Sequence, residues 1–156
     1  MDTLFFHGSS KPNLEKLKPS SAGLFGSGIY VSDSLEDAAE YGMFVYQVRL
    51  RCTRPFITWA DYSLAATCDC DSPVGNLLLD IFGMQRAKEY LREIAHMAFG
   101  VFSEEDIPVQ QTLLGMGYDS IMVHWKSDMR HCVLFSSEHA QIVDKPIELA
   151  YWDLAR

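Results

Sequence analysis

Two short glycine-containing segments near the N-terminus constrain the fold of this chain most. The first is Phe6-His7-Gly8-Ser9, and the second is Gly26-Ser27-Gly28-Ile29-Tyr30, which Tyr41 follows. Because glycine lacks a Cβ, the backbone of Gly8 can come close to a flat carboxamide. The imidazole of His7 can hydrogen-bond a ribose hydroxyl, and tyrosine rings can stack on a nicotinamide ring. These residues predict a strand pair that holds an extended dinucleotide.

The same segments indicate how the dinucleotide is used. Hydride-transfer enzymes bind the phosphates of NAD with a G-x-G-x-x-G loop that opens a helix, and this sequence has no such loop. We therefore expect NAD as a substrate that is consumed rather than as a redox cofactor.

Length and charge limit the class of partner. The 156 residues suffice for one domain that buries about two thirds of its unfolded surface. The net charge of -8 disfavours a nucleic-acid-binding protein, because phosphate neutralisation requires clustered lysine and arginine. An acidic surface suits a protein substrate or a basic partner, and solubility alone explains it equally well. The sequence leaves the oligomeric state open.

The N-terminus and the cysteines point to the cytoplasm. Residues 1–6 contain no positively charged region followed by a long apolar stretch, and the apolar runs are shorter than a membrane span. Cys68 and Cys70 form a C-x-C that lacks the second pair or the histidine spacing of a zinc site. We expect these two cysteines, with Cys52 and Cys132, to be reduced and mostly structural, and we expect no bound metal.

The first third of the chain predicts strands and one short helix. Apolar and aromatic residues predict a strand over 3–6 that ends at His7, and further strands over 28–32 and 44–50. Ser34 begins a capping box, which predicts a helix that continues through Tyr41.

The rest of the chain predicts helices followed by strands. Helical spacing predicts helices over 77–82 and 87–99, and the acids of 103–106 precede a helix over 108–114. Two strands follow, over 120–123 and 131–135, joined by a turn at 126–128, with a further short strand over 141–143. Strands at both ends with helices between them predict an α+β fold.

These motifs resemble a known family. His7-Gly8-Ser9, the segment Gly26-Ser27-Gly28-Ile29-Tyr30-Val31-Ser32 and Tyr41 resemble the signature of ADP-ribosyltransferases of the diphtheria-toxin-like, or poly(ADP-ribose)-polymerase-like, branch, which is known by a histidine, tyrosine, glutamate triad. Residues 117–121, 132–135 and 141–142 look like the C-terminal part of small bacterial and phage members. The resemblance implies two small, mostly antiparallel sheets around an NAD cleft in a single domain, with a helical insertion at about 73–114.

The resemblance also implies roles for individual residues. His7 would hydrogen-bond the adenosine-side ribose, and Gly8 would bind the nicotinamide carboxamide through its backbone. Tyr30 and Tyr41 would sandwich the nicotinamide ring. The serines Ser9 and Ser32 would line the pocket.

The catalytic carboxylate is where this sequence departs from the family. The position that matches the family's glutamate is His131, which supplies no fixed negative charge but can hydrogen-bond a ribose hydroxyl when neutral. The catalytic candidates are therefore His7 and Tyr30 of the triad, with Asp128, in the predicted turn, and His131 in place of the glutamate. Asp119 and Glu138 are further carboxylates nearby. A second departure is Ala38, where eukaryotic members carry a serine that helps to hold the carboxamide.

Each of these residues also has an ordinary structural interpretation. His7 can be a satisfied structural histidine, Tyr30 a core aromatic residue, and Tyr41 part of the buried face of a helix. Asp128 in Lys-Ser-Asp can simply form the turn, and His131 can lie at the edge of the core.

The function implied by the resemblance is mono-ADP-ribosyl transfer from NAD to a macromolecular target, a protein in our interpretation, because members without the glutamate usually transfer one ADP-ribose. The small acidic chain suits a bacterial effector or toxin, or a phage anti-defence protein such as an anti-CRISPR protein. Two alternatives stay open. One is an inactive member that binds a partner or NAD without turnover, and the other is an enzyme that modifies nucleic acid or a small molecule.

Overall fold

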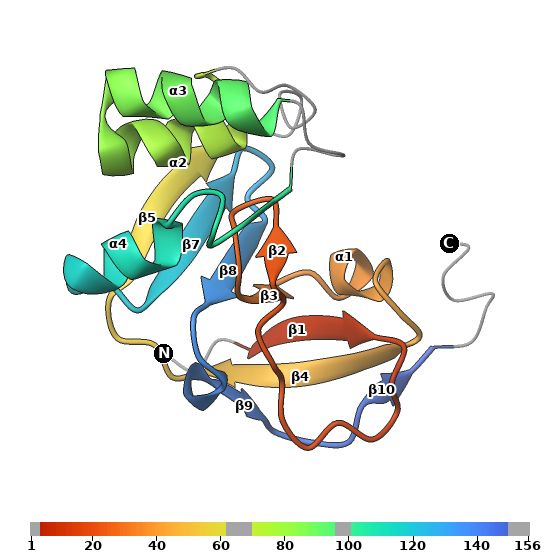
Figure 1. Cartoon of the computed structure of the whole chain (residues 1–156). Helices are drawn as coiled ribbons and strands as arrows, with labels where there is room; N and C mark the ends of the chain where they lie inside the picture. The colour runs from red at the N-terminus through yellow and green to blue at the C-terminus, as the bar shows by residue number, and fades with distance from the viewer. Residues whose placement is uncertain (1–3, 62–69, 96–100, 150–156) are drawn as a thin grey trace.

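The fold of the chain is α+β, as the sequence predicted. The computed structural model describes residues 4–61, 70–95 and 101–149 (Figure 1). The elements at the N-terminal end are β1 (Leu4–Ser9), β2 (Ala22–Gly23), β3 (Ile29–Ser32), α1 (Leu35–Ala39), β4 (Phe44–Leu50) and β5 (Pro55–Ala60). The remaining elements are α2 (Pro73–Phe82), α3 (Met84–Ile94), β6 (Phe102–Ser103), α4 (Val109–Gly115), β7 (Ser120–Trp125), β8 (Arg130–Leu134), the 3-10 helix η3 (Ser137–His139), β9 (Ala140–Ile142) and β10 (Ile147–Glu148).

Within the described residues, one mixed sheet carries the fold, in place of the two small sheets that were expected. Its strand order is β10-β4-β1-β3-β8-β7-β5, with β9 also paired to β4, and β2 and β6 form a separate two-stranded ribbon. The pairs are antiparallel except for β5 with β7, which run parallel. The structure differs from the two small sheets expected, because β3 bonds to β1 on one side and to β8 on the other and so joins their strands into one large sheet.

The connection through β3 is uneven, however. Strand β1 pairs with β4 at every position from Leu4 to Ser9, whereas its pairing with β3 has a single register position, Phe6 opposite Ser32. Figure 1 shows the consequence: β1 and β4 run across the view, while β5, β7 and β8 run steeply. The sheet is therefore nearly split where β1 leaves β3.

Two large apolar clusters hold the two parts of the sheet, and a small third one packs Ala38 and Ala39 of α1 against Val45 of β4. Helices α2, α3 and α4 bury residues such as Leu77, Ile94 and Leu113 against Ile121 and Val123 of β7. The second cluster lies under β1, β3 and β4 and includes Phe5, Val31, Tyr46, Cys132 and Leu134. Burial of apolar surface in these clusters is the main source of stability.

Several elements differ from the sequence prediction in their ends. Strand β1 does not end at His7 but continues to Ser9, because Gly8 and Ser9 keep their pairing with β4. Helix α1 has the predicted Ser34 cap but ends at Ala39, so Tyr41 lies beyond the helix. The predicted helix over 87–99 begins earlier, at Met84, and residues 96–99 lie outside the described part of the chain.

Strand β5 was not predicted at all. It begins at Pro55, which an edge strand accepts at its first position because that residue needs no ladder hydrogen bond. The expected helical insertion over 73–114 contains α2, α3 and α4, but also β6, which pairs with β2. The segment is thereby tied to the loop between β1 and β3.

No helix in the described segments is long and apolar enough to cross a bilayer. Cys52, Cys70 and Cys132 are free thiols, while Cys68 lies outside the described residues. The same described ranges contain no group of three metal-ligating side chains.

Candidate functional site

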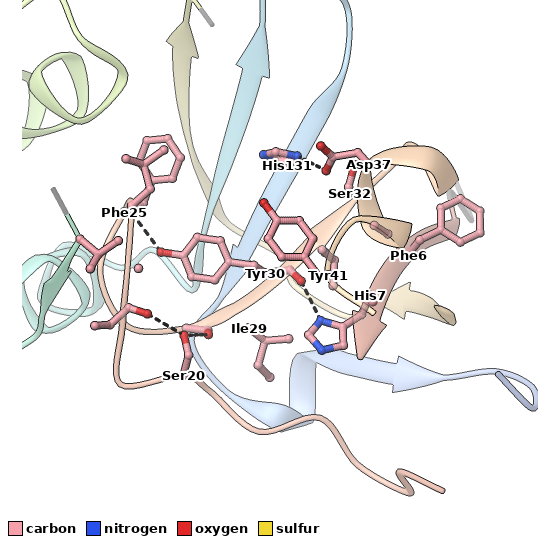
Figure 2. A pocket seen from close by; sticks show the side chains of 18 of the residues that line it. Phe6, His7, Ser20, Phe25, Ile29, Tyr30, Ser32, Asp37, Tyr41 and His131 are labelled. Carbon is pink, nitrogen blue, oxygen red and sulfur yellow. Dashed lines mark hydrogen bonds and ion pairs between the residues drawn. The ribbon is translucent and has the colours of Figure 1, made fainter. Parts of the chain in front are cut away.

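A cavity of about 520 Å³ opens where β1 and β3 separate. Its walls come from β1, from the loop and strand that end at Ser32, from α1 and from β8, and it lies within the usual size range of small-molecule sites (Figure 2). The lining includes the residues His7, Gly8, Tyr30, Ser32, Tyr41 and His131, which the sequence proposed as a site. The structure thus brings together six of the eight residues that were named.

His7 bridges the gap between β1 and β3. Its Nδ1 lies 2.8 Å from the carbonyl oxygen of Tyr30. Because a carbonyl only accepts, Nδ1 carries the hydrogen and donates it. Burial lowers the pKa of His7, which favours the neutral ring, although the bond to Tyr30 opposes the shift. In the neutral ring Nε2 is then an acceptor, suited to a hydroxyl group of a ligand.

Packing alone requires a glycine at position 8. A Cβ built on Gly8 would lie 1.8 Å from the carbonyl oxygen of Ala38 and 3.2 Å from the Cβ of Tyr41. The end of α1 therefore rests directly on the backbone of Gly8. This contact fixes α1 over the cavity and accounts for the glycine without reference to a ligand.

Tyr30 and Tyr41 differ in their surroundings. The hydroxyl of Tyr30 donates to the carbonyl of Gly26 at 2.6 Å and accepts from the amide of Phe25 at 3.0 Å, so it holds the loop before β3. Burial raises the pKa of the Tyr30 phenol well above its ordinary value. Tyr41, in contrast, is 70% exposed at the rim of the cavity. One ring is a fixed wall and the other can be covered by a ligand.

A second polar group lies on the opposite wall. His131 Nε2 is 2.7 Å from a carboxylate oxygen of Asp37, and the indole Nε1 of Trp125 donates to His131 Nδ1 at 3.0 Å. Figure 2 shows Asp37 and His131 facing each other beside Ser32. The hydrogen bond from His131 holds the pKa of Asp37 below its ordinary value, against the opposing effect of desolvation, and Ser32 adds a further hydrogen bond.

The remaining candidates lie elsewhere in the described structure. Ser9 and Asp128 are not among the residues that line the cavity. The Ser9 hydroxyl accepts from the amide of Lys11, and Asp128 occupies the β7–β8 turn with a φ of 69°. Asp119 accepts hydrogen bonds from the amides of Thr53 and Arg54, at the other end of β7.

Glu138, the last of the carboxylates considered, belongs to the 3-10 helix η3 next to β9. The cavity lining does not include it.

Asp37 is the site residue that sequence reasoning missed. The residues around it had been interpreted as a helix cap, and that interpretation is correct, since the Asp37 amide donates to the Ser34 hydroxyl at 3.2 Å. The side chain of Asp37 has a separate role, because pairing of Ser32 with His131 places the first turn of α1 beside β8. The sequence shows that α1 closely follows β3. It does not show that β3 pairs with β8, which is what brings Asp37 to His131.

Comparisons with known proteins leave the family open. No protein-family model matches the chain, and no curated protein matches it. A solved structure described as the crystal structure of an anti-CRISPR protein aligns with 94% of this chain and 96% of its own, at 14% identity and a TM-score of 0.46. A likeness at this level carries no argument about fold or function.

Proposed function

We propose that the chain is a mono-ADP-ribosyltransferase of the diphtheria-toxin-like branch, which uses NAD as its substrate. The observation that carries the proposal is the separation of β1 from β3, which gathers His7, Gly8, Tyr30 and Tyr41 around one cavity. These are the residues to which the family resemblance gives NAD-binding roles, and they come from three different segments of the chain. Their convergence supports the resemblance independently of the motif spelling.

We assign the two ends of NAD to different residues of the cavity lining. The His7 Nε2 acceptor fits a ribose hydroxyl on the adenosine side. Among the described residues that line the cavity, Lys18 is the only lysine or arginine, and it can neutralise the diphosphate. Gly8, Tyr30 and Tyr41 form the part of the wall to which we assign the nicotinamide. Ala38 lines this part and is buried, so the carboxamide receives no hydroxyl from that position.

The first experiment measures binding and turnover together. We expect wild-type protein to bind NAD in calorimetry and to release nicotinamide, and we expect His7→Ala to bind NAD about tenfold to a hundredfold more weakly. His124→Ala is the matched control, because His124 stacks on Trp59 and is not among the cavity-lining residues. Wild-type protein that neither binds NAD nor releases nicotinamide would contradict the proposal.

The acceptor is proposed to be a protein, and the same assay separates the alternatives. Labelled NAD incubated with a bacterial lysate is expected to give a band that is sensitive to protease and resistant to nuclease. A nuclease-sensitive product favours the enzyme that modifies nucleic acid. Binding of NAD without release of nicotinamide identifies an inactive member of the family.

A phage anti-defence role is the narrowest form of the proposal. Its test is to supply a purified CRISPR effector complex with this protein and labelled NAD, and to look for label on one effector subunit together with loss of target cleavage. Loss of cleavage that does not depend on NAD would point to inhibition by binding alone.

A further inference from the structure

Because the family's glutamate is replaced by His131, a catalytic site here needs its negative charge from another residue. Bond cleavage in NAD builds positive charge on the ribose that carries nicotinamide, and a fixed carboxylate near that sugar lowers the barrier. Asp37 is the single acidic side chain among the described residues that line the cavity. It stands on α1 rather than on the strand where the family carries its glutamate.

We propose that Asp37 is the catalytic carboxylate of this site and that His131 is its positioning residue. The inference rests on the proposed function, since it names the group that would act on NAD. It replaces the pairing of Asp128 with His131, because Asp128 lies in the β7–β8 turn and does not line the cavity.

The hydrogen bonds of His131 exclude it as the acid or base. An indole N–H only donates, so the bond from Trp125 requires the lone pair of His131 on Nδ1. The hydrogen of the neutral ring is then on Nε2, where it is donated to Asp37 at 2.7 Å. Both ring nitrogens are used within the protein. His131 therefore acts on NAD only through Asp37.

The position of Asp37 is fixed from both sides. On the strand side, the Asp33 carboxylate accepts from the Arg130 amide at 2.9 Å and forms an ion pair with the Arg130 guanidinium at 3.1 Å, which ties the start of α1 to β8. On the cavity side, the end of α1 rests on Gly8. A short helix held at both ends gives the preorganised charge that electrostatic catalysis requires.

Asp37 is ionised in this arrangement. The hydrogen bond from His131 lowers the pKa of Asp37, so the carboxylate keeps its charge throughout the neutral range. Of the other described titratable residues that line the cavity, His131 bonds to Asp37 directly, and none of the rest (His7, Lys18, Tyr30 and Tyr41) carries a second carboxylate. NAD itself brings a cationic nicotinamide ring, which a carboxylate attracts.

The reaction balances with these groups. The bond between ribose C1′ and the nicotinamide nitrogen breaks, and both bonding electrons leave with nicotinamide, which departs as a neutral molecule. A nucleophilic oxygen or nitrogen of the target protein forms the new bond to C1′ and gives its proton to water. Asp37 forms no covalent bond and stays ionised while the positive charge on the ribose rises and falls.

The decisive variant is Asp37→Asn, which keeps the shape and an oxygen acceptor for His131 but removes the charge. We expect NAD binding in calorimetry within about threefold of wild type and nicotinamide release reduced about 10²–10³-fold at saturating NAD, the size found when one stabilising electrostatic group is removed. Glu36→Gln is the matched control, because it removes a neighbouring acid of α1 that is exposed and outside the cavity lining. It should release nicotinamide at the wild-type rate.

Asp128→Asn tests the rival carboxylate directly, and asparagine tolerates its positive φ. Loss of nicotinamide release in Asp128→Asn with full release in Asp37→Asn would overturn the inference while leaving the proposed function intact. Wild-type protein that binds NAD but releases no nicotinamide overturns it as well. Wild-type protein that does not bind NAD overturns the proposed function together with the inference.

His131 is tested by the split between binding and turnover. We expect His131→Ala to lower the rate at saturating NAD about tenfold or more with little change in the NAD dissociation constant, because Asp37 loses the bond that orients it. His131→Gln can still donate to Asp37 and should recover part of the rate. A merely structural His131 would instead show equal losses in both variants, in step with their thermal stability.

Discussion

The two histidines of the cavity occupy opposite walls and use their nitrogens differently. His7, on β1, donates one nitrogen to the Tyr30 carbonyl and presents the other as an acceptor. His131, on β8, accepts from Trp125 with one nitrogen and donates to Asp37 with the other. The same type of side chain therefore presents a free acceptor to the cavity on the β1 wall and orients a carboxylate on the β8 wall. The difference lies entirely in the partners that the fold supplies.

Helix α1 belongs to both walls, so a change at Gly8, on which α1 rests, should have the largest effect on the cavity. In Gly8→Val, a Cβ at 1.8 Å from the Ala38 carbonyl forces α1 off the strand. We expect a loss of about 3 kcal/mol or more in the free energy of unfolding, measured by urea denaturation, and loss of NAD binding.

Gly115→Ala provides the control for Gly8→Val. A Cβ at Gly115 meets no atom within 4 Å, and this residue ends α4. Alanine there should leave NAD binding unchanged and stabilise the protein by at most about 1 kcal/mol. Equal stability losses at the two glycines would show that the contact of α1 with Gly8 is not the reason for the effect.

The next largest effect is expected from a change on the β1 wall, at His7. His7→Ala removes the acceptor offered to NAD, and we expect the dissociation constant to rise about tenfold to a hundredfold, corresponding to about 1.4–3 kcal/mol, with a smaller change in the rate at saturation. The measurement is calorimetry combined with nicotinamide release at several NAD concentrations. If His7→Ala lowered the rate at saturation while leaving binding intact, the division of roles between the two walls would be wrong.

The β1 wall is where sequence reasoning went furthest. His7, Gly8 and Tyr30 occur in two short local motifs, and local motifs can be recognised from spacing and residue type alone. Strand β4 was predicted with its full range from the alternation at Phe44, Val45 and Gln47, although the structure buries it on both faces, with Val45 in one apolar cluster and Tyr46 and Val48 in another. The cap of α1 at Ser34 could also be predicted, because it is a pattern of four neighbouring residues.

The β8 wall could not be predicted in this way. Contact between Asp37 and His131 joins residues 94 positions apart and depends on which strand pairs with β3. Asp128 was chosen because it is close to His131 in sequence, but the turn carries it away from the cavity. Strand β5 was missed because its partner, β7, is distant in sequence and its exposed positions hold the apolar residues Ile57 and Trp59.

His7 should make both the stability of the protein and the binding of NAD depend on pH. Burial lowers the pKa of His7 below its ordinary value of 6.5, so the unfolded chain binds a proton there at a higher pH than the folded protein. The contribution to stability is complete above pH 6.5 and declines as the pH falls from 6.5 toward the lower folded pKa. NAD binding, which needs the neutral ring, should be constant above pH 6.5 and weaken in the same acidic window.

His7→Asn is the control for the pH experiment, because its amide can still donate to the Tyr30 carbonyl but does not titrate. The difference between wild type and His7→Asn, in both urea denaturation and NAD calorimetry, isolates the histidine. A difference that grows as the pH is raised from 6.5 to 8 would contradict the assignment.

The smallest effect is expected at Lys18, whose ammonium group is exposed at the edge of the cavity. We expect Lys18→Ala to raise the dissociation constant for NAD about twofold to fivefold at low salt, the range of an exposed ion pair, and the difference should shrink as salt is added. Nicotinamide riboside, which has no diphosphate, should bind Lys18→Ala and wild type alike. Lys16→Ala, an exposed lysine outside the cavity lining, is the control. Equal losses of affinity for NAD and for nicotinamide riboside would show that Lys18 does not contact the diphosphate and that its substitution disturbs the β1 wall as a whole.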